Sequence, residues 1–466
     1  MKFVNKKLEE FNNYIKGKKV AIIGLGVSNI PLIDELYKLG ANITLFNNKD
    51  AESLDKTILD KIYEYKLKFF FGENYLNKLV GFDLIFRSPS CRPDTPQVEA
   101  EVQRGALLTS EIELVLEMCP GTTIGVTGSD GKTTTTSLIY QILKEKGLNC
   151  YLGGNIGIPL FTKIKEMKPE DYVVLELSSF QLMTMKVSPQ IAVITNVTPN
   201  HLDIHKSYDE YKEAKANIFK MQNESDLIVL NYDNDITRNF AKEAKGNVVY
   251  FSSKEKLDNG IILDDGIIKD CENGLRRHIV NTKNIKLRGV HNAENICAAV
   301  AATKIFVSPE IQEKAVSEFS GVEHRLEFVK EINGAKWYND SIASSPTRTI
   351  AGLNSFDENI VLIAGGYDKH LDYTPIAKPI VENVGALILL GQTANKIYSA
   401  VTYELKFIKK DLPIYKVNTL EEAVNKAKEV SKKGDVVLFS PASASFDMFK
   451  NFEERGNKFK QIVNKL

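Results

Sequence analysis

The segment that decides the fold reads Thr123-Ile-Gly-Val-Thr-Gly-Ser-Asp-Gly-Lys-Thr-Thr-Thr-Thr-Ser137. A short apolar run leads into a glycine-bearing loop, and Lys132-Thr133 then opens a helix that we expect to reach Leu143. Such a loop points backbone N–H groups inward, and with the helix dipole and the lysine ammonium it forms a cradle for polyphosphate. The Thr133 hydroxyl is a candidate ligand for Mg2+. The segment predicts a site for a nucleoside triphosphate.

The match to the full phosphate-loop pattern is incomplete. Val126 stands where the pattern has its first glycine, with Gly125 and Gly128 nearby. Few chance copies of Gly-x-x-Gly-Lys-Thr have both an apolar strand before them and a helix after them. An ordinary glycine-rich turn between strand and helix is the alternative.

Composition limits the classes to which the chain can belong. Its 466 residues suit two or three domains, and 60 basic and 60 acidic residues give zero formal net charge. That balance argues against nucleic acid or an anionic membrane as the main partner. Five cysteines without Cys-x-x-Cys spacing indicate reduced thiols. The amino terminus lacks an apolar signal core and no run of about 18 apolar residues occurs, so we expect a cytoplasmic protein without membrane insertion. We also expect a monomer.

Short apolar runs alternate with helical patterns along the chain, which predicts an α/β protein with parallel sheets built from βαβ units. We expect three domains: residues 1–110, Rossmann-like; residues 111–320, P-loop ATPase-like; and residues 321–466, again Rossmann-like. A small antiparallel excursion is expected between Ser252 and Arg288. The expected strands are Lys19–Ile23, Ile43–Phe46, Leu84–Phe86, Thr123–Val126, Tyr172–Leu177, Ile191–Val197, Leu227–Asn231, Ile360–Ala364, Ala386–Leu390 and Val436–Ser440.

The first strand leads into Val20-Ala-Ile-Ile-Gly-Leu-Gly-Val-Ser-Asn29. This stretch is typical of the opening of a nucleotide-binding domain, but Asn29 replaces the third glycine of Gly-x-Gly-x-x-Gly. This pattern is compatible with a phosphate-binding site and equally with a tight turn that binds no ligand.

Polar side chains follow two strands of the central region. Glu176 ends an apolar strand, where a carboxylate is a candidate Mg2+ ligand, with a buried ion pair to lysine as the alternative. The next strand leads into Thr195-Asn-Val-Thr-Pro-Asn-His-Leu-Asp-Ile-His205, in which His201 and His205 are candidates for positioning a metal or phosphate.

A helix is predicted over Tyr208–Phe219. At about 100° per residue, Lys215 falls near the centre of its apolar stripe. A lysine there needs an anion, must extend to solvent, or must lose its charge. A neutral amine can react with carbon dioxide, and the resulting carbamate would be a carboxylate-like metal ligand. The stripe comprises Tyr208, Tyr211, Ile218 and Phe219.

Two further groups of polar residues could contact a nucleotide. His291, Asn292 and Asn295 open an alanine-rich helix, where capping by Asn292 is an equally good explanation. Arg325 and Asp340 lie beside the second domain join, where the arginine fits a phosphate clamp or a solvated ion pair.

In chain order these elements resemble the Mur ligase family of ATP-dependent amide-forming enzymes, over almost the whole chain. The closing segment Ser440–Gly456 is similar to that of the D-glutamate-adding members, and the Asp-Asn-Pro-Arg sequence of the diaminopimelate-adding relative is absent. The motifs are Gly128-Ser-Asp-Gly-Lys-Thr-Thr, Gly154-Asn-Ile-Gly, Glu176-Leu-Ser-Ser-Phe-Gln, Asn196-Val-Thr-Pro-Asn-His-Leu-Asp, Tyr211-Lys-Glu-Ala-Lys, Gly289-Val-His-Asn-Ala-Glu-Asn, His324-Arg and Asn339-Asp-Ser.

The resemblance implies ligation of D-glutamate to UDP-N-acetylmuramoyl-L-alanine through an acyl phosphate, with ATP and two Mg2+ ions. The implied catalytic residues are Lys132, His201 and a carbamoylated Lys215. Implied ATP contacts are Gly128, Ser129, Asp130, Gly131, Lys132, Thr133, Thr134, Thr135, Asn295, Arg325 and Asp340. Implied metal ligands are Thr133, Glu176, His201 and Lys215; implied UDP-sugar contacts are Val27, Ser28, Asn47, Ser88, Asn155 and His201; implied D-glutamate contacts are Ser344, Lys369, Ser445 and Phe452.

The chain departs from the family pattern at three places, two of which are among the implied contacts. Asp130 stands where asparagine is usual and adds a negative charge beside the phosphates. Ser90 replaces a glycine in the first domain, and Ser344 replaces a common threonine. A sister amide ligase, a nucleotide-dependent switch and a dinucleotide-dependent oxidoreductase are the alternative functions.

Overall fold

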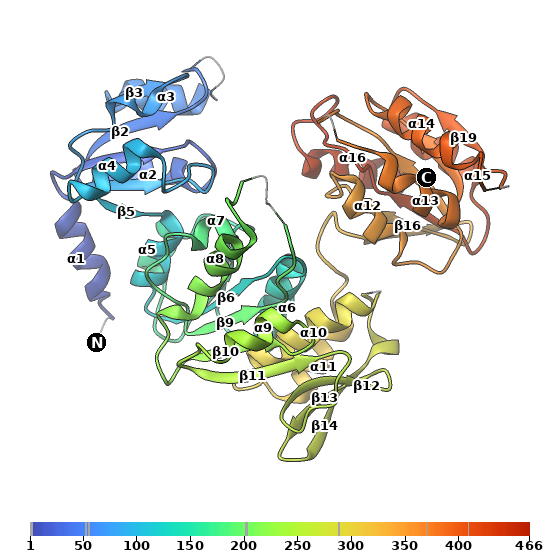
Figure 1. Cartoon of the computed structure of the whole chain (residues 1–466), viewed down its shortest axis with the longest axis horizontal. Coiled ribbons are helices and arrows are strands. Elements are labelled where there is room, and N and C mark those ends of the chain that lie inside the picture. The colour runs from blue at the N-terminus through green and yellow to red at the C-terminus, as the bar shows by residue number, and fades with distance from the viewer. Residues whose placement is uncertain are drawn as a thin grey trace. The chain divides into compact units, whose positions relative to one another are not determined.

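The computed structural model describes residues 3–51, 54, 56–200, 204–287, 289–369, 371–408 and 410–466. They form two compact units, one of Met1–Ile285 with Val290–Ser317 and the other of Lys286–Gly289 with Glu318–Leu466. The described strands form three sheets, two in the first unit and one in the second (Figure 1). This is the α/β architecture that the alternating pattern predicts.

The first sheet has the order β3-β2-β1-β4-β5, and all its pairs are parallel. The chain reverses its direction of winding between β1 and β4, and a crevice forms at such a switch point in parallel sheets. The strands are β1 (Lys19–Ile23), β2 (Asn42–Asn47), β3 (Lys68–Phe71), β4 (Leu84–Arg87) and β5 (Leu107–Thr109). The helices are α1 (Lys6–Ile15), α2 (Asn29–Lys38), α3 (Lys56–Glu64), η2 (Tyr75–Lys78) and α4 (Pro96–Gln103).

The second sheet has the order β14-β13-β12-β11-β10-β9-β6-β8-β7. Its pairs are parallel from β7 to β12, and β12, β13 and β14 then pair antiparallel, which confirms the predicted excursion. The strands are β6 (Thr122–Thr127), β7 (Cys150–Gly154), β8 (Tyr172–Glu176), β9 (Ile191–Ile194), β10 (Leu227–Asn231), β11 (Asn247–Ser252), β12 (Gly260–Asp264), β13 (Ile267–Glu272) and β14 (Leu275–Asn281).

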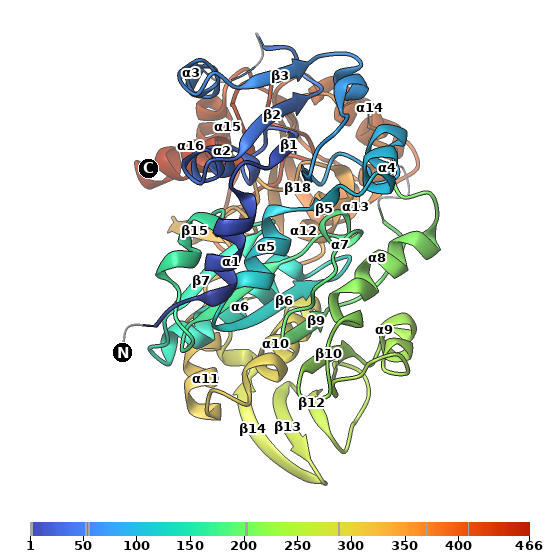
Figure 2. The same cartoon turned by 90° about the vertical axis from the view of Figure 1, so that its left-hand side faces the viewer.

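Helices of this region place the residues that follow β6, β8 and β9. Helices α7 and α8 lie side by side (Figure 2). The alanine-rich α10 packs on α6, because its small side chains permit a close approach of the two helices. The helices are α5 (Glu111–Met118), α6 (Lys132–Glu145), η3 (Phe161–Glu166), α7 (Ser179–Leu182), α8 (Tyr208–Lys220), α9 (Asp235–Phe240), η4 (Thr282–Asn284), α10 (Val290–Thr303) and α11 (Pro309–Glu318).

The third sheet has the order β15-β16-β20-β17-β18-β19, parallel except for the edge strand β15. Its strands are β15 (Glu327–Ile332), β16 (Ala335–Asn339), β17 (Ile360–Ala364), β18 (Val384–Leu389), β19 (Ile414–Lys416) and β20 (Val436–Phe439). Its helices are α12 (Pro346–Leu353), α13 (Thr374–Asn383), α14 (Ala394–Glu404), α15 (Leu420–Val430) and α16 (Phe452–Asn464).

Several element boundaries differ from the sequence prediction by one or two residues, and two larger differences bear on the site. The strand expected over Ile191–Val197 ends at Ile194, because Thr195 and Asn196 turn toward the loop after β6. Capping by Asn292 is wrong, since α10 begins at Val290. The three sheets fall within residues 1–110, 111–320 and 321–466, but the first two share one compact unit, so the domain boundaries stay predictions.

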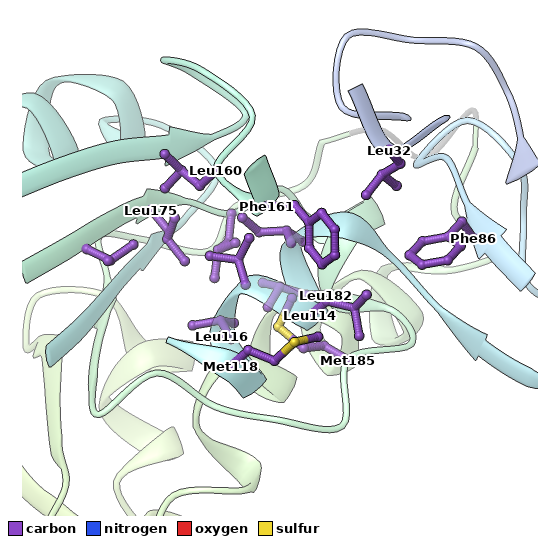
Figure 3. Packing of buried hydrophobic residues seen from close by; sticks show 14 of the residues in the cluster. Leu32, Phe86, Leu114, Leu116, Met118, Leu160, Phe161, Leu175, Leu182 and Met185 are labelled. Carbon is purple, nitrogen blue, oxygen red and sulfur yellow. The ribbon is translucent and has the colours of Figure 1, made fainter. Parts of the chain in front are cut away.

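One continuous apolar cluster joins the first two sheets. It contains Leu32 and Phe86 of the first sheet's layers and Leu114 and Phe161 of the second region, and Figure 3 shows these side chains together. The Phe161 ring also meets Phe11 of α1 edge-on, with the ring centroids 5.8 Å apart. The cluster fixes the first sheet on the second by burial of apolar surface.

Two further features are the state of the cysteines and the character of the helices. All five cysteines, each within the described residues, are free thiols, as the spacing predicts. Among the described residues, no helix combines the length and apolar character needed to cross a bilayer.

Phe161→Ala should lower the free energy of unfolding by about 3–5 kcal/mol, because it leaves a cavity where the two sheets meet. Urea denaturation followed by circular dichroism measures the change. Tyr63→Ala is the control, since that ring is 72% exposed. Equal unfolding midpoints for the two variants would contradict the shared core.

Candidate active site

The loop between β6 and α6 depends on two glycines. Gly128 has φ +154°, and a Cβ there would lie 1.9 Å from Thr195 Oγ1. Gly131 has φ +79°, and a Cβ there would lie 2.2 Å from Asn295 Oδ1. Neither position has room for a side chain, so the close approach of β9 and α10 to the loop requires glycine at both.

The segment after β9 holds the backbone of this loop. The Asn196 carbonyl accepts from the Ser129 N–H at 2.9 Å, and Asn196 Oδ1 accepts from the Asp130 N–H at 3.0 Å. Thr195 Oγ1 donates to the Asp130 carbonyl at 2.5 Å. Sequence reasoning placed Thr195 and Asn196 in a functional segment but missed this role. These hydrogen bonds fix the main chain of Asp130, while the residue as a whole is exposed to solvent.

The predicted ATP contacts of the first unit, residues 128–135 and Asn295, lie around the first turn of α6. Lys132 Nζ bends back and donates to the carbonyls of Gly128 and Ser129 at 2.9 and 3.0 Å. Thr133 is half-buried, while Thr134 and Thr135 are buried and Thr135 Oγ1 lies 3.4 Å from Asn295 Oδ1. The structure thus brings Asn295 to the loop, beside the unpaired backbone donors that a helix start offers to phosphate.

Glu176 ends β8, the strand next to β6. Its side chain is buried, and Asn155 Nδ2 donates to Oε1 at 2.8 Å. The Oε2 atom is buried without a hydrogen-bond partner among the described residues. The partner of Oε1 is therefore Asn155 and not a lysine, which was the alternative considered from the sequence. An unpaired buried carboxylate oxygen next to a phosphate loop fits the chemistry of a divalent cation.

Lys215 of α8 is 1% exposed, as its place on the apolar stripe predicts. Its Nζ donates to the Gly128 carbonyl at 2.6 Å and lies 4.7 Å from the centroid of the Tyr211 ring. Burial, and then the charge of Lys132, holds the pKa of Lys215 well below its ordinary value. Burial therefore makes loss of the ammonium proton easier here than in water.

The predicted metal site is only partly defined by the described residues. His201 lies outside them. Within the described ranges no three His, Cys, Asp or Glu side chains form a metal-binding group. His205 is buried and hydrogen-bonded to Ser179 at 3.0 Å, so it faces α7 and not the loop. A cation beside Thr133 and Glu176 would need oxygen ligands from a bound phosphate and water.

Two of the residues predicted to bind the UDP-sugar, Asn47 and Ser88, contact the turn after β1. A Cβ on Gly24 would lie 2.4 Å from Ser88 Oγ, and the Leu25 N–H donates to Asn47 Oδ1 at 3.4 Å. Asn29 Nδ2 donates to the carbonyls of Ile23 and Gly24, so the residue in place of the third glycine holds the turn.

Three other sugar-site predictions have different environments. Val27 is 75% exposed, and Ser28 precedes α2 without a capping hydrogen bond from its side chain. Asn155 lies in the second sheet region, bound to Glu176. The structure gives no contact between these residues and Asn47 or Ser88.

The predicted D-glutamate residues follow three adjacent strands of the second unit. Ser344 follows β16, Lys369 follows β17 and Ser445 follows β20, and parallel strands deliver these residues to one edge of the sheet. Lys369 Nζ lies 5.7 Å from the ring centroid of Phe446, and the Phe452 carbonyl accepts from Ser341 Oγ at 2.8 Å.

Arg455 is a buried residue of this region that sequence reasoning did not assign. Its guanidinium donates to Ser341 Oγ and to the carbonyls of Ser341, Ser443 and Ala444 at 2.8–3.1 Å. Burial lowers its pKa to about 10. The arginine connects the loop after β16 to the loop after β20. The only sequence feature that could have indicated this role is its position in the closing segment Ser440–Gly456.

Asp340, a predicted nucleotide contact, lies directly after β16. Its Oδ2 accepts from Ser440 Oγ at 2.7 Å and its Oδ1 from the Leu326 N–H at 3.3 Å. Burial raises the pKa of Asp340 to about 7, although Ser440 and Arg325 favour the charged form. Both Arg325 and Asp340 belong to the second unit, so their approach to ATP stays a prediction.

Asp340→Asn should weaken the pH dependence of stability. Because the pKa is raised in the folded state, the stabilisation that protonated Asp340 provides is complete below the unfolded pKa of 3.8 and is lost progressively as the pH rises through about 7. The variant should therefore gain melting temperature relative to the unaltered protein at pH 8 and not at pH 5, without nucleotide. The exposed Asp357→Asn is the control. If the change in melting temperature between pH 5 and pH 8 is the same in Asp340→Asn as in the unaltered protein, the raised pKa of Asp340 is contradicted.

Comparisons with known proteins agree with this architecture. A family model described as "Mur ligase middle domain" matches residues 126–303, and one described as "Mur ligase, glutamate ligase domain" matches residues 324–443. The chain is 54% identical over 465 residues to UDP-N-acetylmuramoylalanine--D-glutamate ligase of Acetivibrio thermocellus, covering 99% of this chain and 100% of the relative. The protein of that name from Clostridium novyi is 50% identical over the same length, with the same shares covered.

Solved structures share the fold. UDP-N-acetylmuramate-alanine ligase (MurC) of Thermotoga maritima has a TM-score of 0.58 at 19% identity, covering 96% of this chain and 99% of that one. MurF ligase of Thermotoga maritima, solved in complex with ADP, has a TM-score of 0.55 at 20% identity, covering 97% of each chain. With the phosphate loop, the buried Glu176 and Lys215 beside it and full-length relatives at this identity, the chain belongs to the Mur ligase family.

Proposed function

We propose that this chain joins D-glutamate to UDP-N-acetylmuramoyl-L-alanine while ATP is converted to ADP and phosphate, a step of peptidoglycan precursor synthesis. The observation that carries the proposal is the 54% identity, over the full length, to a relative named for that reaction. The phosphate loop with its buried acidic and basic neighbours supports it independently. Partners are then small molecules, and we further propose a cytoplasmic monomer that needs neither nucleic acid nor membrane.

The reaction needs an activated acid, because a carboxylate oxygen is a poor leaving group. Attack of the alanyl carboxylate oxygen on the γ-phosphorus of ATP forms a P–O bond, breaks the bond to ADP and gives an acyl phosphate. Lys132, whose ammonium now contacts two loop carbonyls, would turn to the phosphates and neutralise charge there. The backbone N–H groups of residues 131–134 would hold the phosphates, whereas that of Thr135 already donates to the Gly131 carbonyl at 2.9 Å.

Thr133, Glu176, His201 and Lys215 are the residues we propose for two Mg2+ ions. The unpaired Oε2 of Glu176 is the observation that favours a cation there. Bound magnesium would supply positive charge to the phosphate oxygens. Asn155 would hold Glu176 in position through its hydrogen bond to Oε1.

Lys215 is proposed to carry a carbamate. The ammonium would first lose one proton to solvent. The neutral amine would then attack the carbon of carbon dioxide, so that an N–C bond forms as one C=O π bond opens to a carboxylate oxygen. A second N–H proton would leave to solvent, and the side chain would become an anion. The ammonium and the carbamate have opposite charges, so the modification would reverse the electrostatic effect of α8 on the loop.

The second half of the reaction uses the D-glutamate amine. Its lone pair attacks the acyl carbon, a tetrahedral oxyanion forms, and the C–O bond to phosphate breaks to leave the amide. Because the proposed amine site and the acyl site lie on different units, catalysis requires the units to bring them together. Ser344, Lys369, Ser445 and Phe452 would hold the amino acid, and Arg325 and Asp340 would contact the nucleotide.

Phosphate release from ATP should require both UDP-N-acetylmuramoyl-L-alanine and D-glutamate. A panel with L-glutamate, L-alanine, L-lysine and diaminopimelate in place of D-glutamate is the control. With 18O in the alanyl carboxylate, one labelled oxygen should appear in the released phosphate. Turnover with L-alanine alone would favour a sister ligase, and turnover without any amino acid would favour a nucleotide-dependent switch.

Lys215→Ala should lose more than about tenfold in turnover, as expected for a metal-ligand residue or its support. Short carboxylic acids, which can occupy the vacated space, should restore part of the activity. In the unaltered protein, 13C-bicarbonate should give a carbamate carbon resonance that Lys215→Ala lacks. Lys212→Ala is the control, because that lysine is partly exposed and pairs with Asp209. A resonance unaffected by Lys215→Ala would contradict the modification.

A further inference from the structure

Two arginines of the first sheet region reach across to the second. Arg87, the last residue of β4, donates to the Phe180 carbonyl at 2.6 Å and to Thr184 Oγ1 at 3.3 Å. Its side chain is buried, and it also holds the Cys91 carbonyl at 2.7 Å. The loop that carries Ser88 is therefore bonded to α7 at its base.

Arg92 lies at the far end of the same loop. Its guanidinium makes a bidentate pair with Glu210 of α8, with Nη2 2.6 Å from Oε1 and Nη1 3.2 Å from Oε2. Asp94 pairs with its other side, and the Ile204 carbonyl accepts from it at 2.6 Å. Bidentate arginine–carboxylate pairs fix orientation as well as distance.

Glu210 continues the connection into the interior. Hydrogen bonds from Arg92 lower its pKa, so the carboxylate is ionised and can only accept. His205 Nδ1 lies 3.3 Å from Glu210 Oε2 and must carry the proton, which leaves Nε2 to accept from Ser179 Oγ at 3.0 Å. Burial lowers the pKa of His205, which is consistent with a neutral ring.

The four residues Arg92, Glu210, His205 and Ser179, here called the relay, connect the proposed sugar site to both halves of the proposed reaction site. Ser179 opens α7, shortly after Glu176 at the end of β8. Glu210 is in the first turn of α8, which also carries Lys215. The His205 ring stacks on Phe180, with centroids 5.0 Å apart, and meets Tyr211 edge-on, whose hydroxyl is 2.9 Å from Ser129 Oγ.

We propose that the relay is a positioning device for the ligation: it sets the loop that binds the sugar nucleotide relative to Glu176 and Lys215, so that the acyl end meets the γ-phosphate in reactive geometry. The inference rests on the proposed function. None of the four residues contacts the reacting atoms in this account, so each is a positioning residue. Lys206, which pairs with Asp94, adds a further ionic contact at the same edge.

A purely structural role would have different consequences. If the relay only stabilised the fold, its loss would lower the melting temperature and leave the kinetics of the folded enzyme intact. If it positions the sugar nucleotide, its loss must reduce kcat and raise the KM for that substrate while the KM for ATP stays the same. The backbone of the ATP loop is held by Thr195 and Asn196, which are not members of the relay.

Glu210→Gln and His205→Phe test the proposal in the full chain. The first keeps the size of the side chain and removes its charge; the second keeps a ring to stack on Phe180 and removes both hydrogen bonds. Each should reduce kcat/KM for UDP-N-acetylmuramoyl-L-alanine by about tenfold to a hundredfold, the range expected for misplacement of a reacting group. Glu166→Gln, which removes an exposed ion pair with Lys163 on η3, should leave both KM values and kcat unchanged.

The double variant Arg92→Met with Glu210→Gln should be no worse than the more severe single variant, because both break the same connection. Unchanged kcat and KM in folded variants with lower melting temperatures would overturn the relay and leave the proposed function standing. A parallel rise in the KM for ATP would also overturn it. Absence of D-glutamate-dependent phosphate release from the unaltered protein would overturn the proposed function and the relay with it.

Discussion

The site depends on the close approach of three segments to one short loop. Gly128 meets the end of β9, and Gly131 meets α10, at distances that exclude even a methyl group. Because the loop backbone is held by the side chains and carbonyls of Thr195 and Asn196, its N–H groups do not have to be ordered by the ligand. The positions of Lys132, Thr133 and Lys215 all follow from that loop, since each lies on a helix that begins at it or contacts it.

Local features of the chain were predictable from sequence. The apolar runs gave the strands Lys19–Ile23, Leu227–Asn231 and Ile360–Ala364 with the bounds that the structure has. Helical periodicity placed Lys215 inside the protein, because the position of a residue on a helix face is fixed by its spacing. The glycine-lysine motif located the phosphate loop for the same reason: its geometry is encoded in consecutive residues.

The parts that could not be predicted depend on contacts between distant residues. Arg92 and Glu210 are 118 positions apart, and nothing in either local pattern distinguishes them from solvated charges. Arg455 was quoted as part of a motif, yet its four acceptors come from two separate loops. The end of β9 was misjudged because Thr195 and Val197 have strand propensity, which the hydrogen bonds to the neighbouring loop override.

For the proposed D-glutamate site, the buried guanidinium of Arg455 bears on selectivity between mirror-image amino acids. It ties two loops of the second unit together, and a ligand bound there would meet walls that are already ordered. Little configurational entropy would then be lost from the protein on binding, so affinity would reflect shape more than adaptation. A rigid chiral surface can exclude the wrong enantiomer by steric conflict alone, whereas a flexible surface would rearrange to bind either enantiomer.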